Sequence, residues 1–422
     1  MDPNKIDRQT FRALVLLSIA YFVQATTALC VVGGFASISS EWRLTTTESA
    51  MLVSAFGATF AVTAPLLQML VGHWIRRTQI LAGLSVMAFG AVGFALAPSY
   101  PVLFAARIVM GLGAALISPI LAALGSSMVK PAQQGAALAT ILMGLGISAV
   151  IGVPSSAWIA LHVGPRWMFA SIAGLTLITA MSIVVFIRDR SPGERVSPKQ
   201  VVALVQRPAT IGALLTAFFI TAGIFSTYTM ISPIMHDRYD AGPHLISIAF
   251  LVYGVSGLVG NLFVRRISAA FSAEILLRSA VVTLIVIFTG LLILPLSLTV
   301  LLAALVAWPF VLDVFWPSQQ RRIVELEPAL RGLALAVTAS FLFTGIAAGS
   351  ALGGAFYPKF GLSSVLMTSI VLLLIGLGTL SFSVRAMKPK PAGTTPAGIS
   401  KSRGTNEDGT CLANTCADRA WS

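Results

Sequence analysis

Apolar stretches, each long enough to cross a lipid bilayer as a helix, dominate this sequence. Stretches of about 17 to 25 apolar residues have this property, and they are too uniformly apolar for the alternating strands of a membrane β-barrel. Only 10% of the residues are charged and 56% are hydrophobic, whereas soluble domains carry roughly 25% charged residues. We therefore predict an all-α membrane protein with twelve spans, at residues 13–38, 48–70, 79–98, 102–125, 136–160, 168–187, 209–232, 244–264, 273–294, 298–318, 332–356 and 362–384.

Sequence features of the first six spans recur in the last six at a nearly constant offset. The segment Pro131–Ala139 (PAQQGAALA) returns 197 residues later as Pro328–Ala336 (PALRGLALA), and Gly152 returns as Gly349 at the same offset. Such a repeat indicates two similar helical bundles joined end to end. Membrane proteins built in this way place a substrate between the bundles, near the bilayer midplane.

The repeat predicts four segments along the chain. Residues 1–187 form an N-terminal six-helix bundle, 188–208 a basic and proline-rich cytoplasmic linker, and 209–387 a C-terminal six-helix bundle. Residues 388–422 are rich in Lys, Pro, Gly, Ser and Thr. Because such a composition cannot bury a core, we expect a disordered cytoplasmic tail there.

The net charge of +13 follows the predicted topology. If the N-terminus is inside, 23 of the 28 Lys and Arg residues lie in inner loops and tails, and four lie in outer loops. This positive-inside bias places both termini in the cytoplasm. The localisation that we expect is a plasma membrane, the inner membrane of a bacterium, and the charge does not indicate nucleic-acid binding.

Short motifs in the first half resemble those of a known transporter family. Arg107-x-x-x-Gly111-x-Gly113 in the fourth span, Gly152-Val153-Pro154 in the fifth, and Gly72–Thr78 (GHWIRRT) between the second and third are similar to motifs of the major facilitator superfamily. The resemblance covers residues 10–387 and is strongest to the arabinose-efflux-like subgroup of the drug:proton antiporter branch. It implies the major facilitator fold, with two six-helix repeats that rock against each other.

The resemblance also implies which residues form the moving interface. Gly144, Ser148, Gly152 and Ser156 are four residues apart, as are Gly345, Gly349 and Gly353. Small residues at this spacing let a neighbouring helix approach closely, either as ordinary helix packing or as the rocking contact. Pro154 is expected to kink its helix or to loosen the local hydrogen-bond ladder, and to act as a hinge. The predicted interface residues are Gly72, Arg76, Arg77, Gly144, Gly152, Pro154, Gly349 and Gly353.

Two charged residues stand out because they lie within predicted spans. A charge there costs about 2.5 to 3.5 kcal/mol on insertion scales, so an unneeded one is expected to be lost. Arg107 either extends to the outer headgroups or, as the resemblance implies, lies in the cavity and binds substrate or influences a proton site. Asp313 is either a proton site, because burial favours the neutral carboxyl group, or an aspartate that reaches cytoplasmic water or Arg321 and Arg322. A direct pair of Arg107 with Asp313 is not expected, since Asp313 lies roughly 13 Å deeper.

Analogy with the family adds polar and aromatic residues to the predicted cavity: Gln24, Thr27, Phe225, Tyr228 and Trp308. These side chains suit a neutral or amphipathic solute better than a strongly ionised one. Relatives in the subgroup often carry an acidic residue in the first span, where this chain has Ala28.

These features predict a secondary active transporter that exports a small molecule, such as a drug-like compound, a sugar or a nucleoside, by proton antiport. A proton-independent facilitator or uptake carrier stays open, because the first span lacks its acid. A membrane receptor or enzyme is a remote alternative, because no catalytic cluster or large loop is present. We found no phosphate-binding loop or metal-ligand constellation, so we expect no cofactor, no metal and no enzymatic activity. The expected partners are a small-molecule substrate, protons and the lipid bilayer, and we expect a monomer.

Overall fold

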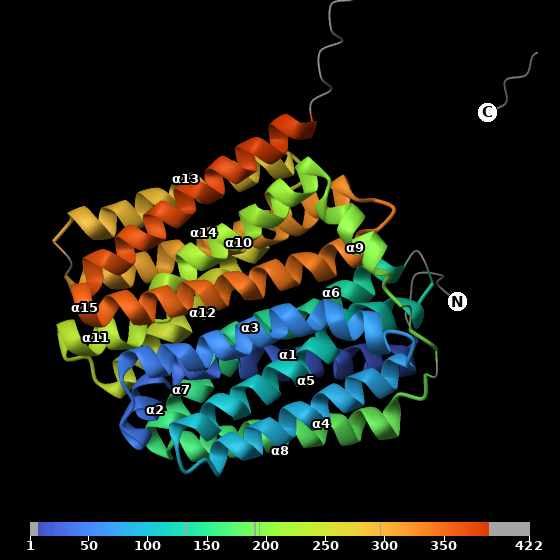
Figure 1. Cartoon of the computed structure of the whole chain (residues 1–422), viewed down its shortest axis with the longest axis horizontal. Coiled ribbons are helices and arrows are strands. Elements are labelled where there is room, and N and C mark those ends of the chain that lie inside the picture. The colour runs from blue at the N-terminus through green and yellow to red at the C-terminus, as the bar shows by residue number, and fades with distance from the viewer. Residues whose placement is uncertain (1–6, 131–132, 190, 194, 296, 388–422) are drawn as a thin grey trace, which may run out of the picture. The chain divides into compact units, whose positions relative to one another are not determined.

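The computed structural model describes residues 7–130, 133–189, 191–193, 195–295 and 297–387. In this part the chain forms fifteen α-helices, a π-helical segment and one isolated β-bridge, between Ile75 and Pro192 (Figure 1). The first half contains α1 (Arg8–Gly33), α2 (Phe35–Trp42), α3 (Thr46–Val71), α4 (Arg76–Ala95), α5 (Tyr100–Ser127), α6 (Gln134–Ile147), the π-helical segment η2 (Ser148–Gly152), α7 (Val153–His162) and α8 (Pro165–Phe186). The linker and the second half contain α9 (Pro198–Val205), α10 (Pro208–Tyr228), α11 (Ile231–Tyr239), α12 (Pro243–Ile267), α13 (Ala273–Ile293), α14 (Leu298–Leu326) and α15 (Arg331–Met387).

The predicted membrane helices are present. Eleven helical stretches in the described residues are long and apolar enough to cross a membrane. The last of them, α15, has 57 residues, about 85 Å at 1.5 Å per residue, whereas the hydrocarbon core is about 30 Å thick. At Gly361 the backbone takes φ 69° and ψ −165°, a conformation that essentially only glycine adopts. The chain turns back there, so α15 supplies two spans and the total is twelve.

Local side chains explain several helix ends. Thr45 and Glu48 form a capping box at the start of α3, in which each side chain accepts a backbone N–H of the other residue. Ser197 and Gln200 cap α9 in the same way, and Pro198 fills its first position, where no N–H is needed. Three short helices were not predicted: α2 and α11, which follow the first spans of the two halves, and α9 in the linker.

The two ends of the bundle differ in what they contain. The linker end holds the start of α1, the loop between α3 and α4, α9 and the end of α15. The opposite end, called the hairpin end here, holds α2, α11 and the turn at Gly361 (Figure 1). The predicted tail, 388–422, lies outside the described residues.

Helices of the first half pack mainly on one another, and so do those of the second half. The main contacts between the halves join α3 to α15 and α12 to η2 and α7. Along α3 the cross-half contacts begin near the hairpin end, where the Thr47 hydroxyl donates to the Gly354 carbonyl at 2.7 Å. They continue to the rings of Phe60 and Phe343, whose centroids are 3.9 Å apart and whose planes are tilted by 31°.

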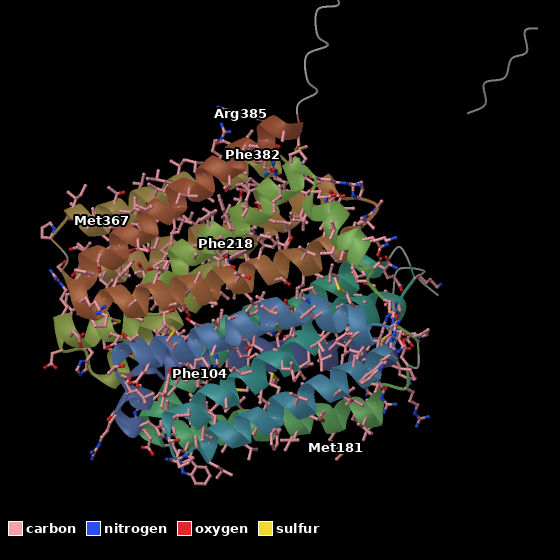
Figure 2. The ribbon with its side chains drawn as sticks, viewed as in Figure 1. Phe104, Met181, Phe218, Met367, Phe382 and Arg385 are labelled. Carbon is pink, nitrogen blue, oxygen red and sulfur yellow. The ribbon has the colours of Figure 1, made fainter. Side chains whose placement is uncertain are left out.

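Large apolar side chains cover the flanks of the bundle (Figure 2). Met181, Met367 and Phe382 are each more than half exposed. Apolar surface of this extent is unfavourable in water and matches the hydrocarbon of a bilayer. The outer surface of the bundle is therefore apolar, as twelve membrane-spanning helices require.

Candidate functional site

Arg107 lies in the core of the first half and is fully buried. Its Nε donates to the Leu52 carbonyl at 3.0 Å, and Nη1 and Nη2 donate to the Thr27 and Ala28 carbonyls at 2.8 and 3.0 Å. The guanidinium also lies 4.6 Å from the centre of the Phe56 ring, close enough for a cation–π contact. The side chain thus links α1, α3 and α5, and the alternative that it extends to the headgroups is wrong.

The polar residues expected in the cavity from the first span bond within the first half. Gln24 is buried and accepts a hydrogen bond from the Ser118 hydroxyl of α5 at 2.9 Å. The Thr27 hydroxyl donates to the Val23 carbonyl of its own helix at 2.7 Å. In this conformation Gln24 joins α1 to α5, whereas the Thr27 hydroxyl bonds within α1.

The aromatic residues expected in the cavity belong to one cluster in the second half. Tyr228 of α10 has its ring centroid 5.2 Å from that of Phe225 and 6.2 Å from that of Trp308 of α14. The structure adds Tyr253 of α12, which is 4.9 Å from Tyr228 and 5.5 Å from Trp308, and Phe288 of α13, 4.9 Å from Trp308. Sequence analysis missed the last two because nothing local distinguishes them from other aromatic residues in spans.

Trp308 is almost completely buried, and its indole Nε1 has no hydrogen-bond partner. A buried donor without a partner costs about 1 to 3 kcal/mol. The indole N–H is therefore a group that a bound acceptor would satisfy.

Asp313 lies near the middle of α14, fifteen residues after its first residue, and faces α12. A Cβ atom added to Gly257 would overlap the carboxylate Oδ2 and lie 3.3 Å from Cγ, so the carboxyl group occupies the notch that this glycine leaves. Pro309, one turn earlier on α14, packs at the same place. Tyr253 is one turn from Gly257 on α12, so the carboxyl group and the aromatic cluster are neighbours.

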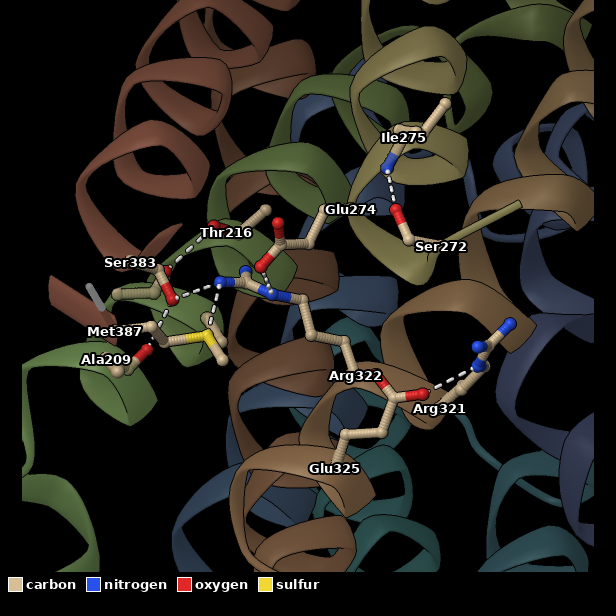
Figure 3. Close-up of polar contacts among 12 residues, drawn as sticks. Ala209, Thr216, Ser272, Glu274, Ile275, Arg321, Arg322, Glu325, Ser383 and Met387 are labelled. Carbon is tan, nitrogen blue, oxygen red and sulfur yellow. Dashed lines mark hydrogen bonds and ion pairs between the residues drawn. The ribbon is translucent and has the colours of Figure 1, made fainter. Parts of the chain in front are cut away.

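The arginines that could neutralise Asp313 are engaged elsewhere (Figure 3). Arg321 pairs with Glu325 at 2.7 Å, with Nε donating. Arg322 is buried, donates from Nη2 to the Ser383 hydroxyl at 2.9 Å and lies 3.8 Å from Glu274. Within the described residues no ion pair joins Asp313 to any arginine, Arg107 included, which agrees with the expected separation of those two.

The regularly spaced glycines make close contacts, but within each half. A Cβ on Gly144 would overlap the Ser18 carbonyl of α1, and one on Gly152 the Thr26 side chain of α1. In the second half Gly349 meets Ala222, and Gly353 meets Ser226, both on α10. Glycine spacing thus reveals a close approach without naming the partner helix, and the role of these residues in the moving interface stays a prediction.

Other glycines form the contacts between the halves. Gly57 of α3 lies against the Phe343 carbonyl of α15, and Gly354 of α15 lies against Ala50 of α3. Gly254 of α12 lies against Ala149 and Val150 in η2. Gly354 directly follows the predicted interface residue Gly353, whereas sequence analysis did not select Gly57 and Gly254.

Pro154 is the second residue of α7, which follows the π-helical segment directly. Proline has no N–H, so it leaves the carbonyl four residues earlier, that of Val150, without its helical donor. The backbone widens into η2, where the Val153 N–H donates to the Ser148 carbonyl five residues back. The loosened ladder expected at Pro154 is present, and it lies where α12 of the other half touches the chain.

The loop with Gly72, Arg76 and Arg77 contacts its own half and the linker. Arg77 Nη2 donates to the Val184 carbonyl at the end of α8 at 2.6 Å. The Arg76 backbone N–H donates to the Ser191 carbonyl at 3.2 Å. The Gln79 side-chain amide donates to the Gly72 carbonyl at 3.2 Å.

A further polar group, missed in the sequence, lies at the linker end. Glu327 is buried, with its carboxylate accepting from the Thr210 hydroxyl at 2.7 Å and from Arg207. Its place just before the repeated segment at Pro328 was the one available signal. No group of three or more His, Cys, Asp and Glu side chains that could hold a metal ion occurs among the described residues.

The model of the Major Facilitator Superfamily matches residues 17–326. The chain belongs to this superfamily. It is a multi-pass membrane transporter, and the resemblance of the motifs is confirmed at this level. The finer assignment, to the arabinose-efflux-like subgroup, stays a prediction.

Curated relatives are similar over most of their length. The uncharacterized MFS-type transporter YbcL of Bacillus subtilis is 27% identical over 366 residues, which cover 86% of this chain and 93% of that protein. The inner membrane transport protein YdhP of Escherichia coli is 28% identical over 342 residues, covering 81% and 88%. A chloramphenicol resistance protein of Streptomyces lividans is 28% identical over 267 residues, covering 62% and 68%.

Solved structures show the same fold. A bacterial homologue of the human lysosomal transporter Spinster, in an inward-facing and occupied conformation, superposes with a TM-score of 0.73 at 14% identity and covers 92% of this chain. A D-xylose–proton symporter superposes with a TM-score of 0.71 at 13% identity and covers 90%. The predicted fold class, the major facilitator fold, is confirmed.

Proposed function

We propose that this protein is a proton-coupled exporter of small molecules, with Asp313 as the proton site. The observation that carries the proposal is a carboxyl group in the middle of a membrane span with no ion-pair partner among the described residues. A charge there is costly, and a carboxyl group can remove this cost by taking up a proton. The chloramphenicol resistance protein among the relatives favours export of drug-like compounds, with sugars and nucleosides as other candidate substrates.

The geometry suggests how a proton would act on the conformation. On α12, Gly257 holds the Asp313 carboxyl group, and Gly254, three residues earlier, touches Ala149 of the other half. A change of charge at Asp313 therefore acts on the helix that carries a cross-half contact. A proton drives transport only if the two conformations bind it with different affinity.

The substrate site of this proposal lies between the halves, beside the aromatic cluster of Tyr228, Tyr253 and Trp308. Arg107 acts there as a positioning residue, because its guanidinium nitrogens hold backbone carbonyls of α1 and α3. The moving units are the bundles 1–187 and 209–387, joined by the linker 188–208.

We further propose that the linker end faces the cytoplasm of a bacterial cell, as the distribution of Lys and Arg favours. Because the hydrogen bonds and ring contacts between the halves, among the described residues, lie between the hairpin end and the middle of α3, this conformation is then closed on the outer side. Reporter fusions to the N-terminus and after Met387 test the orientation. A periplasmic signal from either fusion would contradict it.

The decisive assay is retention of labelled drugs, sugars and nucleosides by efflux-deficient bacterial cells that express the chain. We expect lower retention of at least one compound, restored by a protonophore. Asp313→Asn is expected to abolish the export that the proton gradient drives. Asp237 is an exposed aspartate at the hairpin end, and Asp237→Asn is expected to leave this export intact. Export by Asp313→Asn equal to the parent excludes Asp313 as the proton site.

Equilibration that a protonophore does not change would instead support the alternative, a facilitator or uptake carrier on the same fold. Gly257→Ala separates position from charge, because the added Cβ displaces the carboxyl group without removing it. We expect this variant to resemble Asp313→Asn.

A further inference from the structure

The linker is attached to both halves. On the first half, a short segment of the linker runs antiparallel to the loop between α3 and α4. This segment, called the strap here, comprises Ser191, Pro192, Gly193 and Arg195. The Gly193 N–H donates to the Trp74 carbonyl at 2.9 Å, and the Arg76 N–H donates to the Ser191 carbonyl at 3.2 Å. Arg195 adds a side-chain bond, from Nε to His73 Nδ1 at 3.0 Å.

The strap lies unusually close to the loop at Gly193. A Cβ atom there would overlap the Gly72 carbonyl oxygen and lie 3.0 Å from the Trp74 carbonyl oxygen. The Gln79 amide donates to the same two carbonyls, at 3.2 and 3.0 Å. Because these neighbours are backbone atoms held by a buried side chain, they cannot move aside cheaply for any residue other than glycine.

The rest of the linker is attached to the second half. Helix α9 inserts Leu204, which is fully buried, into a small core that it shares with α10, α14 and α15. Val201 and Val205 pack against the same core. Figure 1 shows α9 at the linker end, beside the first turns of α15.

Between these two attachments the linker covers the gap between the halves. Val196 and Val201 line a cavity of about 20 Å³ together with residues of α3, α5 and α15, namely Ala64, Pro65, Gln68, Pro119, Leu333, Ala336 and Val337. This space holds about one water molecule. Gln68 is its one polar lining residue, and its buried amide Nε2 has no hydrogen-bond partner. A buried donor is expected to be paired, so the amide is placed to meet an acceptor.

We propose that the linker is a latch: the strap and α9 together plug the linker-end mouth of the solute pathway, and Gln68 is the first polar group that a solute meets once they are displaced. A solute with a carbonyl or hydroxyl acceptor satisfies the Gln68 amide at the position that the valines now cover. Solute passage requires release of the strap, whose described residues are held by two backbone hydrogen bonds and one exposed side-chain bond.

The test measures how fast Gln68→Cys reacts with a bulky maleimide. It uses the purified full chain with Cys30, Cys411 and Cys416 replaced by Ser. Gly193→Ala is expected to raise the rate about tenfold, because losing the two backbone bonds shifts the open fraction by roughly that factor. Gly332→Ala is the matched control, since a Cβ at that linker-end glycine meets no atom within 4 Å.

Equal rates in Gly193→Ala and Gly332→Ala would overturn the proposal. A second reporter, Ser350→Cys, is fully buried in α15 near the hairpin end. Its rate is expected to stay unchanged in Gly193→Ala. A parallel rise at both reporters would mean general loosening and would also overturn the latch. The measurement needs neither a substrate nor a proton gradient, so its outcome is independent of the proposed export.

Discussion

Replacing Gly254 by alanine should shift the protein away from the conformation described here. The added Cβ would overlap the Ala149 carbonyl oxygen and lie 2.7 Å from its carbon and 2.9 Å from Val150 Cα, whereas ordinary contacts are 3.4–4 Å. These are backbone atoms of the other half, so relief requires α12 and η2 to separate. Overpacking of this kind costs about 1 to 3 kcal/mol.

The cost falls on the state in which the two halves meet at this point. If the alternative state separates α12 from η2, the equilibrium shifts toward it by a factor of about 5 to 150. The hairpin end then opens, because α12 and α11 of the second half contact η2, α7 and α2 of the first half on the way to that end. Gly254→Ala is thus expected to populate a conformation that is open at the hairpin end.

Spin labels on Ser40→Cys of α2 and His236→Cys of α11 report this opening, because both residues are exposed and their helices touch across the halves. We expect a longer distance population in Gly254→Ala. Gly146→Ala, on α6 two residues before η2, meets no atom within 4 Å and serves as the control. Distance distributions that agree between the two variants would refute the view that this backbone contact sets the conformation.

Three further substitutions test the packing of each half through thermal unfolding in detergent. Arg107→Met removes three charge-assisted hydrogen bonds from the core and should lower the stability of the fold by about 2 to 5 kcal/mol. Arg43→Met, at the exposed end of α2, should change this stability little. Similar unfolding midpoints for the two variants would contradict the positioning role of Arg107. Glu327→Ala leaves Thr210 without its acceptor and should cost about 1 to 3 kcal/mol, against under about 1 kcal/mol for Glu325→Ala in a surface pair. Trp308→Ala empties the centre of the aromatic cluster and should cost about 3 to 5 kcal/mol; a loss below that of Glu325→Ala would show that the cluster is loosely packed.

Much of the candidate site was visible in the sequence as residue types but not as contacts. Arg107 and Asp313 stood out because a charge in an apolar span is costly. Their partners could not be read: Arg107 binds carbonyls from residues 55 to 80 positions earlier in the chain, and every residue offers the same carbonyl group. Tyr253, Gly257 and the strap had no local signal, because each gains its role from a helix or loop distant in sequence.

The sequence by itself determined the twelve spans and their two-fold repeat, because a bilayer imposes length and apolarity on each helix separately. It also determined where helices could approach closely, since glycines mark such places along one chain. Only the tertiary structure decided which helices meet there: Gly144 and Gly349 pack inside their own halves, and Gly57 and Gly254 pack between them. Helix–helix contacts in a membrane depend on shape and on backbone approach rather than on hydrophobicity, so their partners are fixed by the assembled bundle.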